Sequence, residues 1–287
     1  MTGSRVFDHR PCQLGEGPFW HPIREHLFWF DITGNRLLTQ TSAGPEEWRF
    51  AENVSAAGWV SRDVLLIASE TALLTFDLTT GVREVVCPLE ATNPITRSND
   101  GRADPQGGFW IGTMGKKAEA GAGAIYRYYR GELRRLFAPI TISNAICFAP
   151  SGRTAYFTDT DTRQILAVAL DAQGWPVGAP TVHVDTVAEG LRPDGAVVDL
   201  QGNLWVAQWG AARVSAYDPQ GRYLTHVGFE SPHTSCPTFG GAEMSTLFCT
   251  TALQGMTEEA RARYPDAGKV FTAPTLFRGQ YEHQVIL

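Results

Sequence analysis

The sequence predicts an all-β protein, a six-bladed β-propeller in which four-stranded sheets form a ring around a central metal site. Short apolar runs rich in aromatic residues recur at a nearly constant interval, with clusters of glycine, aspartate and proline between them. Only the stretch 256–263 has a helical pattern, and it is brief. With 43% hydrophobic and 19% charged residues, the 287-residue chain is long enough to bury a large core. We expect residues 1–287 to form one propeller domain.

The interval between the apolar runs indicates blades of four strands. Successive central residues lie 37, 44, 47, 48 and 43 positions apart, a mean of about 44, which is in the range of propeller repeats. The six central residues are Trp29, Leu66, Trp110, Phe157, Trp205 and Phe248. The alternative is two all-β sandwich domains, but no stretch near the middle of the chain has the composition of a linker.

A second strand-like segment follows each central run, and several continue through a hairpin turn into a third strand. The six second segments are 36–40, 73–78, 124–129, 164–170, 213–217 and 269–272. A ring of blades must also close, because an open edge strand promotes aggregation. We expect the strand-like residues 5–12 to complete the last blade.

Composition excludes several partners and compartments. The formal net charge of −6 argues against a nucleic-acid partner, and no apolar run approaches the length of a membrane span. The N-terminal residues have no apolar signal-peptide core, so we expect a cytoplasmic protein. The odd number of cysteines and their wide spacing indicate buried thiols: Cys12, Cys87, Cys147, Cys236 and Cys249. We expect His21 and His26, beside a hairpin turn, to lie at the surface.

Polar residues recur at a fixed distance before the central apolar residues. Counting back 13 or 11 positions in blades one, three, four and five reaches Glu16, Arg97, Asn99, Asn144, Arg192 and Asp194. The same count in blades two and six reaches Asn53, Ser55, Ser235 and Pro237. Each residue alone could be a turn residue, a cap or a surface charge. Equivalent positions of different blades, however, point to one central channel. The shared register therefore predicts convergence of side chains that lie up to 178 residues apart: Glu16, Arg97, Asn99, Asn144 and Asp194.

Such a cluster suits one divalent metal ion. Carboxylate and amide oxygens are hard ligands, preferred by Ca²⁺, Mg²⁺ or Mn²⁺, with Zn²⁺ less favoured. Three protein ligands would leave positions open for water and substrate. Asp194 is our candidate catalytic base, and Arg97 and Asn99 would bind a hydroxyl-rich or anionic ligand. The sequence contains no Gly-x-Ser-x-Gly, His-Glu-x-x-His or Walker motif.

The chain resembles the regucalcin (senescence marker protein)/gluconolactonase family of six-bladed propellers. The matching segments are LGEGPFW at 14–20, RSNDG at 97–101 with GTM at 112–114, ISN at 142–144 and RPDG at 192–195. The resemblance implies a divalent metal ion on Glu16, Asn144 and Asp194, with Arg97 and Asn99 contacting the substrate. It also implies hydrolysis of a small-molecule sugar lactone to the sugar acid. We expect a monomer or small homo-oligomer.

One stretch departs from the family pattern. Many members resembling regucalcin carry an acidic pair after Gly-Thr-Met, whereas this chain has Gly115, Lys116 and Lys117. We hypothesise that Lys117, or Lys116, faces the pocket and favours an acidic lactone derived from an aldaric or uronic acid. The alternative is a solvated lid loop.

Two other functions remain open at this point. One is a paraoxonase-type lactonase or esterase that acts on apolar lactones. The other is a non-catalytic calcium-binding or scaffold propeller.

Overall fold

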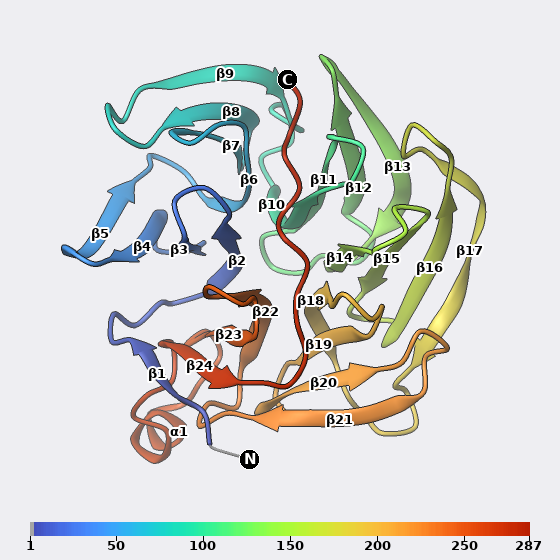
Figure 1. The fold of residues 1–287 in the computed structure, drawn as a ribbon. Coiled ribbons are helices and arrows are strands. Elements are labelled where there is room, and N and C mark those ends of the chain that lie inside the picture. The colour runs from blue at the N-terminus through green and yellow to red at the C-terminus, as the bar shows by residue number, and fades with distance from the viewer. Residues whose placement is uncertain (1–2) are drawn as a thin grey trace.

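The structure, a computed structural model that describes residues 3–287, is a ring of six four-stranded antiparallel sheets (Figure 1). The predicted six-bladed propeller is confirmed. The first strands of neighbouring blades contact one another around the centre, and the later strands of each blade lie progressively farther out.

Each blade takes four strands. Blade one contains β2 (Gly15–His21), β3 (His26–Asp31), β4 (Arg36–Thr41) and β5 (Gly44–Arg49). Blade two contains β6 (Val54–Trp59), β7 (Val64–Ser69), β8 (Ala72–Asp77) and β9 (Arg83–Pro88). Blade three contains β10 (Thr96–Ala103), β11 (Phe109–Gly115), β12 (Gly123–Tyr129) and β13 (Glu132–Ile140). Blade four contains β14 (Ser143–Phe148), β15 (Thr154–Asp159), β16 (Gln164–Leu170) and β17 (Pro176–Asp185). Blade five contains β18 (Pro193–Val198), β19 (Leu204–Gln208), β20 (Arg213–Tyr217) and β21 (Tyr223–Gly228). Blade six contains β22 (Thr234–Gly240), β23 (Thr246–Thr251), β24 (Val270–Pro274) and β1 (Arg5–Asp8).

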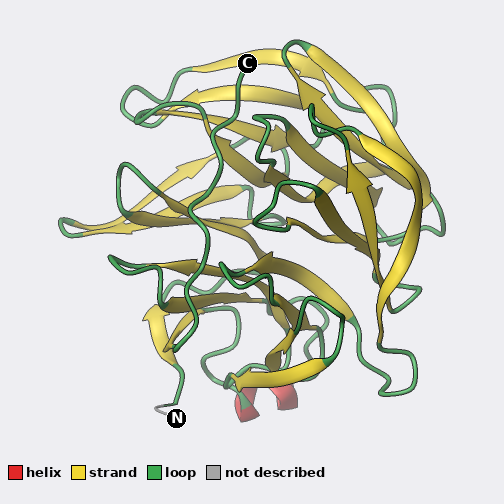
Figure 2. Ribbon diagram, turned by 45° about the vertical axis from the view of Figure 1, so that its right-hand side comes forward, coloured by secondary structure: helices red, strands yellow, loops and turns green. Residues whose placement is uncertain are grey.

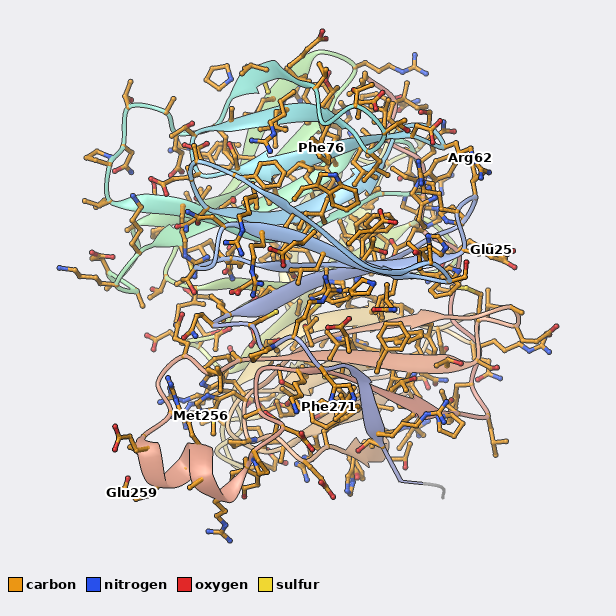
Figure 3. The ribbon with its side chains drawn as sticks, turned by 90° about the vertical axis from the view of Figure 1, so that its left-hand side faces the viewer. Glu25, Arg62, Phe76, Met256, Glu259 and Phe271 are labelled. Carbon is orange, nitrogen blue, oxygen red and sulfur yellow. The ribbon has the colours of Figure 1, made fainter. Side chains whose placement is uncertain are left out.

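The core lies between the sheets, where the second strand of each blade is buried. All six predicted central residues are buried, and their apolar clusters join neighbouring blades. Figure 3 shows Phe76 and Phe271 inside these layers, whereas Glu25, Arg62 and Glu259 lie at the periphery. The six predicted second segments correspond to β4, β8, β12, β16, β20 and β24, with ends shifted by two residues at most.

Two segments hold the ring together. β1 pairs antiparallel with β24, so the expected closure by residues 5–12 is confirmed for Arg5–Asp8. The C-terminal segment 275–287, without regular structure, crosses one face of the ring (Figures 1 and 2). It carries Glu282 to Arg102 on the central strand β10, and the two side chains form a mostly buried ion pair. The sequence pattern did not reveal this segment, because it has no periodicity.

Helical structure is minor. The helix α1 (Glu258–Arg263) falls within the predicted stretch 256–263, and the side chain of Thr257 caps its N-terminus. It lies at the edge of the ring beside blade six (Figure 2). Among residues 3–287, no helix has the length and apolar character that crossing a membrane requires.

The cysteines are free thiols and mostly buried, as expected, but one of the two histidines expected at the surface is buried. All five thiols are free, and every one except the half-buried Cys87 is buried. His21 is fully buried rather than exposed, because the β2–β3 hairpin packs against blade two. Its ring lies 5.9 Å from that of Trp59, and its Nε2 is 3.2 Å from the carbonyl oxygen of Ser61. His26 is half-buried.

Candidate active site

A β-bulge recurs in the innermost strand of every blade. The pairing between the first and second strands shifts register near Glu16, Asn99, Asn144 and Asp194, and at the equivalent places in blades two and six. Bulges redirect side chains and are frequent next to active sites. Gly17 has a positive φ of 52° immediately after Glu16. The local backbone of the site is therefore built by the same irregularity in all six blades.

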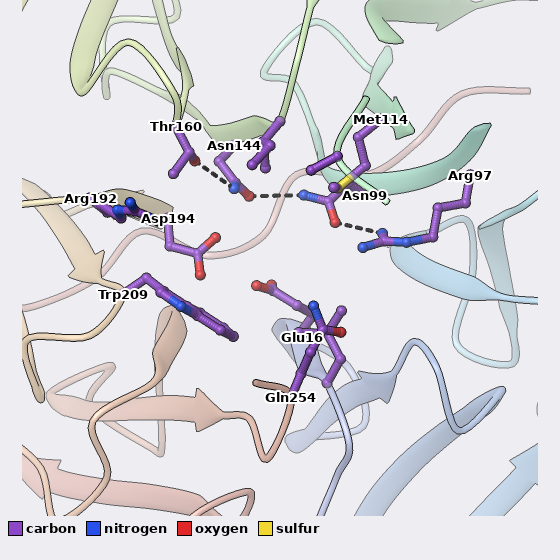
Figure 4. A pocket seen from close by; sticks show the side chains of 13 residues that line it. Glu16, Arg97, Asn99, Met114, Asn144, Thr160, Arg192, Asp194, Trp209 and Gln254 are labelled. Carbon is purple, nitrogen blue, oxygen red and sulfur yellow. Dashed lines mark hydrogen bonds between the residues drawn. The ribbon is translucent and has the colours of Figure 1, made fainter. Parts of the chain in front are cut away.

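Most of the predicted site residues meet around one cavity. Its volume is about 190 Å³, below the roughly 300–1,000 Å³ typical of pockets for drug-sized ligands. Figure 4 shows five predicted residues around it, all of them buried: Glu16, Arg97, Asn99, Asn144 and Asp194. A cavity of this size, with both charged and apolar side chains in its wall, suits a sugar-sized ligand.

The structure does not place every predicted residue in the cavity. Lys117 is exposed and does not line the cavity, and Lys116 forms an ion pair with Glu70. The loop after β11 turns outward at these residues, and only Ala118 of this loop lines the cavity. In blade two, the Asn53 side chain donates to the carbonyl oxygen of Ile32 and to Asn35, so it holds a turn instead.

Several lining residues were missed by the backward count. Thr160 and Trp209 come directly after the second strands β15 and β19, and Gln254 comes shortly after β23. The second strand runs antiparallel to the first, so its end lies beside the start of the first strand. A forward count from each central residue could have found these positions.

A chain of hydrogen bonds connects polar residues of blades three and four. Arg97 Nη1 donates to Asn99 Oδ1 at 2.7 Å, and Asn99 Nδ2 donates to Asn144 Oδ1 at 3.1 Å. Asn144 Nδ2 then donates to Thr160 Oγ1 at 2.9 Å (Figure 4). These bonds hold both amide side chains in one orientation.

The charges around the cavity do not balance. Burial raises the pKa of Asp194 well above its usual value, and the nearby charges of Glu16 and Asp100 raise it further. Burial likewise raises the pKa of Glu16, with Asp100 adding to the effect. Arg97 is a buried cation of the cavity wall, and burial lowers its pKa to about 10. Three buried carboxylates (Glu16, Asp100 and Asp194) thus lie near two guanidinium groups, the buried Arg97 and the exposed Arg192, since Glu282 neutralises Arg102. A divalent cation would supply the missing positive charge.

The donor set fits such a cation. No group of three or more His, Cys, Asp or Glu side chains arranged for a metal occurs within residues 3–287. Glu16, Asn144 and Asp194 instead offer two carboxylates and one amide oxygen. Oxygen-only sets of this kind suit Ca²⁺, Mg²⁺ and Mn²⁺.

Comparison with known proteins identifies the family. The SMP-30/gluconolactonase/LRE-like region matches residues 14–253. The chain belongs to this family. It is 40% identical to a predicted sugar lactone lactonase of Rhizobium meliloti (strain 1021), covering 97% of this chain and 96% of the relative. It is 34% identical to the L-arabinolactonase of Azospirillum brasilense, and the match covers 93% of this chain and 90% of the relative. A solved structure of regucalcin, a calcium-binding protein from Agrobacterium tumefaciens, superposes with a TM-score of 0.97 at 37% identity, covering 99% and 98%.

The family segments and the cavity coincide. The segments quoted from the sequence begin at 14, 97, 142 and 192, and each supplies at least two residues to the cavity wall. The SMP-30/gluconolactonase resemblance inferred from those segments is confirmed.

Proposed function

We propose that this protein is a metal-dependent lactonase that hydrolyses a sugar lactone to the open-chain sugar acid. The observation that carries the proposal is the convergence of Glu16, Asn144 and Asp194 at one small, negatively charged cavity. The chain is a carboxylic ester hydrolase of the lactonase type, the class of its named enzyme relatives.

Glu16, Asn144 and Asp194 would hold the divalent cation. When bound, the cation polarises an ester carbonyl and makes water a better nucleophile. Its identity among Ca²⁺, Mg²⁺, Mn²⁺ and Zn²⁺ depends on availability as well as on these ligands. The calcium-binding regucalcin neighbour supports a divalent ion.

Arg97 orients the lactone, and Asp194, besides holding the cation, moves a proton. Arg97 uses Nη1 for Ser98 and Asn99, while its Nε and Nη2 make no hydrogen bond within residues 3–287. We assign those two donors to the substrate carbonyl or a ring hydroxyl. Asp194 accepts a proton from the attacking water as the water oxygen bonds to the carbonyl carbon. The bond from that carbon to the ring oxygen then breaks, and the ring oxygen takes up the proton as a hydroxyl group.

The acidic-lactone hypothesis moves from Lys117 to Arg192. Arg192 lines the cavity, is exposed, and has no ion-pair or hydrogen-bond partner for its side chain among the described residues. Figure 4 shows it beside Asp194 at the cavity edge. Trp209 forms the adjacent wall, with its ring stacked on His233 at 4.3 Å. A sugar ring lying on Trp209 would bring a distal carboxylate to Arg192, where charge-assisted hydrogen bonds form.

Metal removal and a lactone panel test the proposal. We expect EDTA to abolish acid release from a sugar lactone, and added Mn²⁺ or Ca²⁺ to restore it. A lower melting temperature without any lactone turnover would instead indicate a scaffold propeller. Preference for apolar lactones would indicate a paraoxonase-type enzyme, which the charged and amide side chains of the cavity wall disfavour.

The acidic preference has its own test. We expect a higher kcat/KM for glucarolactone or galactarolactone than for a neutral aldonolactone, and a loss of that preference in Arg192→Met. A wild-type preference for the neutral lactone would contradict it.

A further inference from the structure

We infer that Thr160 is a positioning residue for the metal site, because its hydroxyl determines which end of the Asn144 amide faces the cavity. The inference rests on the proposed function in taking Asn144 as a metal ligand. Thr160 itself touches neither the cation nor the substrate in this scheme. It acts through Asn144.

The first support is the hydrogen bonding of the Thr160 hydroxyl. Its Oγ1 lies 2.7 Å from the carbonyl oxygen of Pro193, which can only accept a hydrogen bond. A hydroxyl group has a single proton, so Thr160 must donate that proton to Pro193. Its oxygen is then left as an acceptor. The NH₂ end of the Asn144 amide, 2.9 Å away, is the group that satisfies it.

The second support comes from the opposite end of the chain of hydrogen bonds, at Arg97. Arg97 has only donors, so the group that it meets at 2.7 Å must be the amide oxygen of Asn99. The NH₂ end of Asn99 therefore points away from Arg97. It donates to the carbonyl oxygen of Ser143 at 2.8 Å and to Asn144 Oδ1 at 3.1 Å.

Both ends of the chain of hydrogen bonds thus impose the same direction of donation. Every donor points from Arg97 towards Pro193, and the Asn144 amide is compatible with its two neighbours in only one of its two flips. In that orientation Oδ1 accepts one hydrogen bond from Asn99 and keeps a second lone pair for a cation. The reversed amide would present N–H groups to the cation, and these cannot coordinate it.

Thr160 is held firmly enough to impose this orientation. It is buried directly after β15, and its backbone N–H donates to the carbonyl oxygen of Ile142 at 3.0 Å. Asn144 Nδ2 has no other acceptor within residues 3–287. Loss of the Thr160 oxygen would therefore leave the Asn144 NH₂ group without an acceptor and only the hydrogen bond from Asn99 to hold the amide.

The test measures Mn²⁺ binding by titration with electron paramagnetic resonance, using the full chain. We expect Thr160→Val to weaken the Mn²⁺ Kd by about 10- to 100-fold, the usual effect of losing a partner of a metal ligand. Thr160→Ser keeps the hydroxyl and should bind nearly as tightly as wild type. At saturating Mn²⁺, kcat of Thr160→Val should recover towards the wild-type value.

Thr158→Val provides a matched control. Thr158 lies in β15 of the same blade and donates to the carbonyl oxygen of Gln164 at 2.7 Å, but it does not line the cavity. This variant should melt at a lower temperature and bind Mn²⁺ normally. If Thr160→Val is too unstable to purify, Thr160→Ala replaces it in the comparison with Thr160→Ser.

Two results would overturn the inference. If wild type binds Mn²⁺ and folded Thr160→Val binds within twofold of it, the positioning role is wrong and the proposed function stands. If wild type binds no divalent cation at all, the inference and the proposed metal dependence fail together.

Discussion

Asn99 donates a hydrogen bond of 3.1 Å from its side-chain nitrogen to the side-chain oxygen of Asn144, across the boundary between blades three and four. Asn99 is a proposed substrate contact, and Asn144 is a proposed metal ligand. The two roles are therefore physically coupled, because moving either amide changes the hydrogen bonding of the other. We expect variants at these two positions to have non-additive effects.

Asp194→Asn should abolish most lactone hydrolysis. The change removes the proposed base and one of two carboxylate ligands while keeping the shape of the side chain. We expect kcat/KM to fall by at least about 100-fold, the lower end of the range for general acid–base catalysis. Acid release from a sugar lactone measures it. Glu189→Gln is the control, since Glu189 is exposed in the loop before β18. Near-normal turnover by folded Asp194→Asn would remove Asp194 from the mechanism.

Divalent cations should stabilise the protein more strongly as pH rises. Burial and the charge of Asp100 raise the pKa of Glu16 from 4.5 to about 8. A raised pKa means that the folded state favours protonated Glu16. This contribution to metal-free stability is full below pH 4.5 and is lost as pH rises through 8. A cation offsets the charge that appears. Melting curves with and without Mn²⁺ should therefore diverge between pH 5.5 and 8; a constant gap would contradict the charge argument.

Glu282→Ala should destabilise the ring without touching the cavity. It leaves the buried Arg102 guanidinium without its ion-pair partner, which costs about 3–5 kcal/mol for a buried pair. Adding Arg102→Met should recover part of that loss. Thermal unfolding measures both variants. Gln284→Ala, an exposed change in the same C-terminal segment, is the control and should have a much smaller effect.

Gly17→Ala should destabilise the bulge that follows Glu16. Gly17 has a positive φ of 52°, and an added Cβ would lie 2.2 Å from the carbonyl oxygen of Ser55. Gly131→Ala is a matched control, because Gly131 also has a positive φ, of 84°, with open space around it. Both substitutions place alanine at a positive φ, which destabilises the folded state by more than about 1 kcal/mol. Only Gly17→Ala adds a steric clash, so it should lower the melting temperature further. Equal losses would mean that the clash is relieved at no cost.

Local chemistry made much of the architecture predictable. The burial of Trp29, Trp110 and Trp205 follows from apolar runs that recur at a constant spacing, and this spacing is a property of the chain alone. The sequence register predicted that Glu16, Asn144 and Asp194 lie close together, because equivalent positions of a repeat occupy equivalent places in the ring. In these cases one periodicity sets both the local structure and its place in the fold.

Lys117 and Thr160 show where this reasoning ends. A charge in a loop has no periodicity to orient it, and Lys117 lies outside the cavity that its place in the sequence suggested. Thr160 is an ordinary threonine after a strand until blades four and five meet, when its hydroxyl comes within reach of Pro193.

The sequence by itself determined the number of blades, their closing strand and the residues that share a register. Only the tertiary structure decided which side chains of different blades are in contact. It also brought Glu282 to Arg102, from which it lies 180 residues away in the sequence. The physical reason is that repeat spacing is encoded locally, whereas hydrogen bonds and ion pairs between blades depend on distances that exist only once the ring has closed.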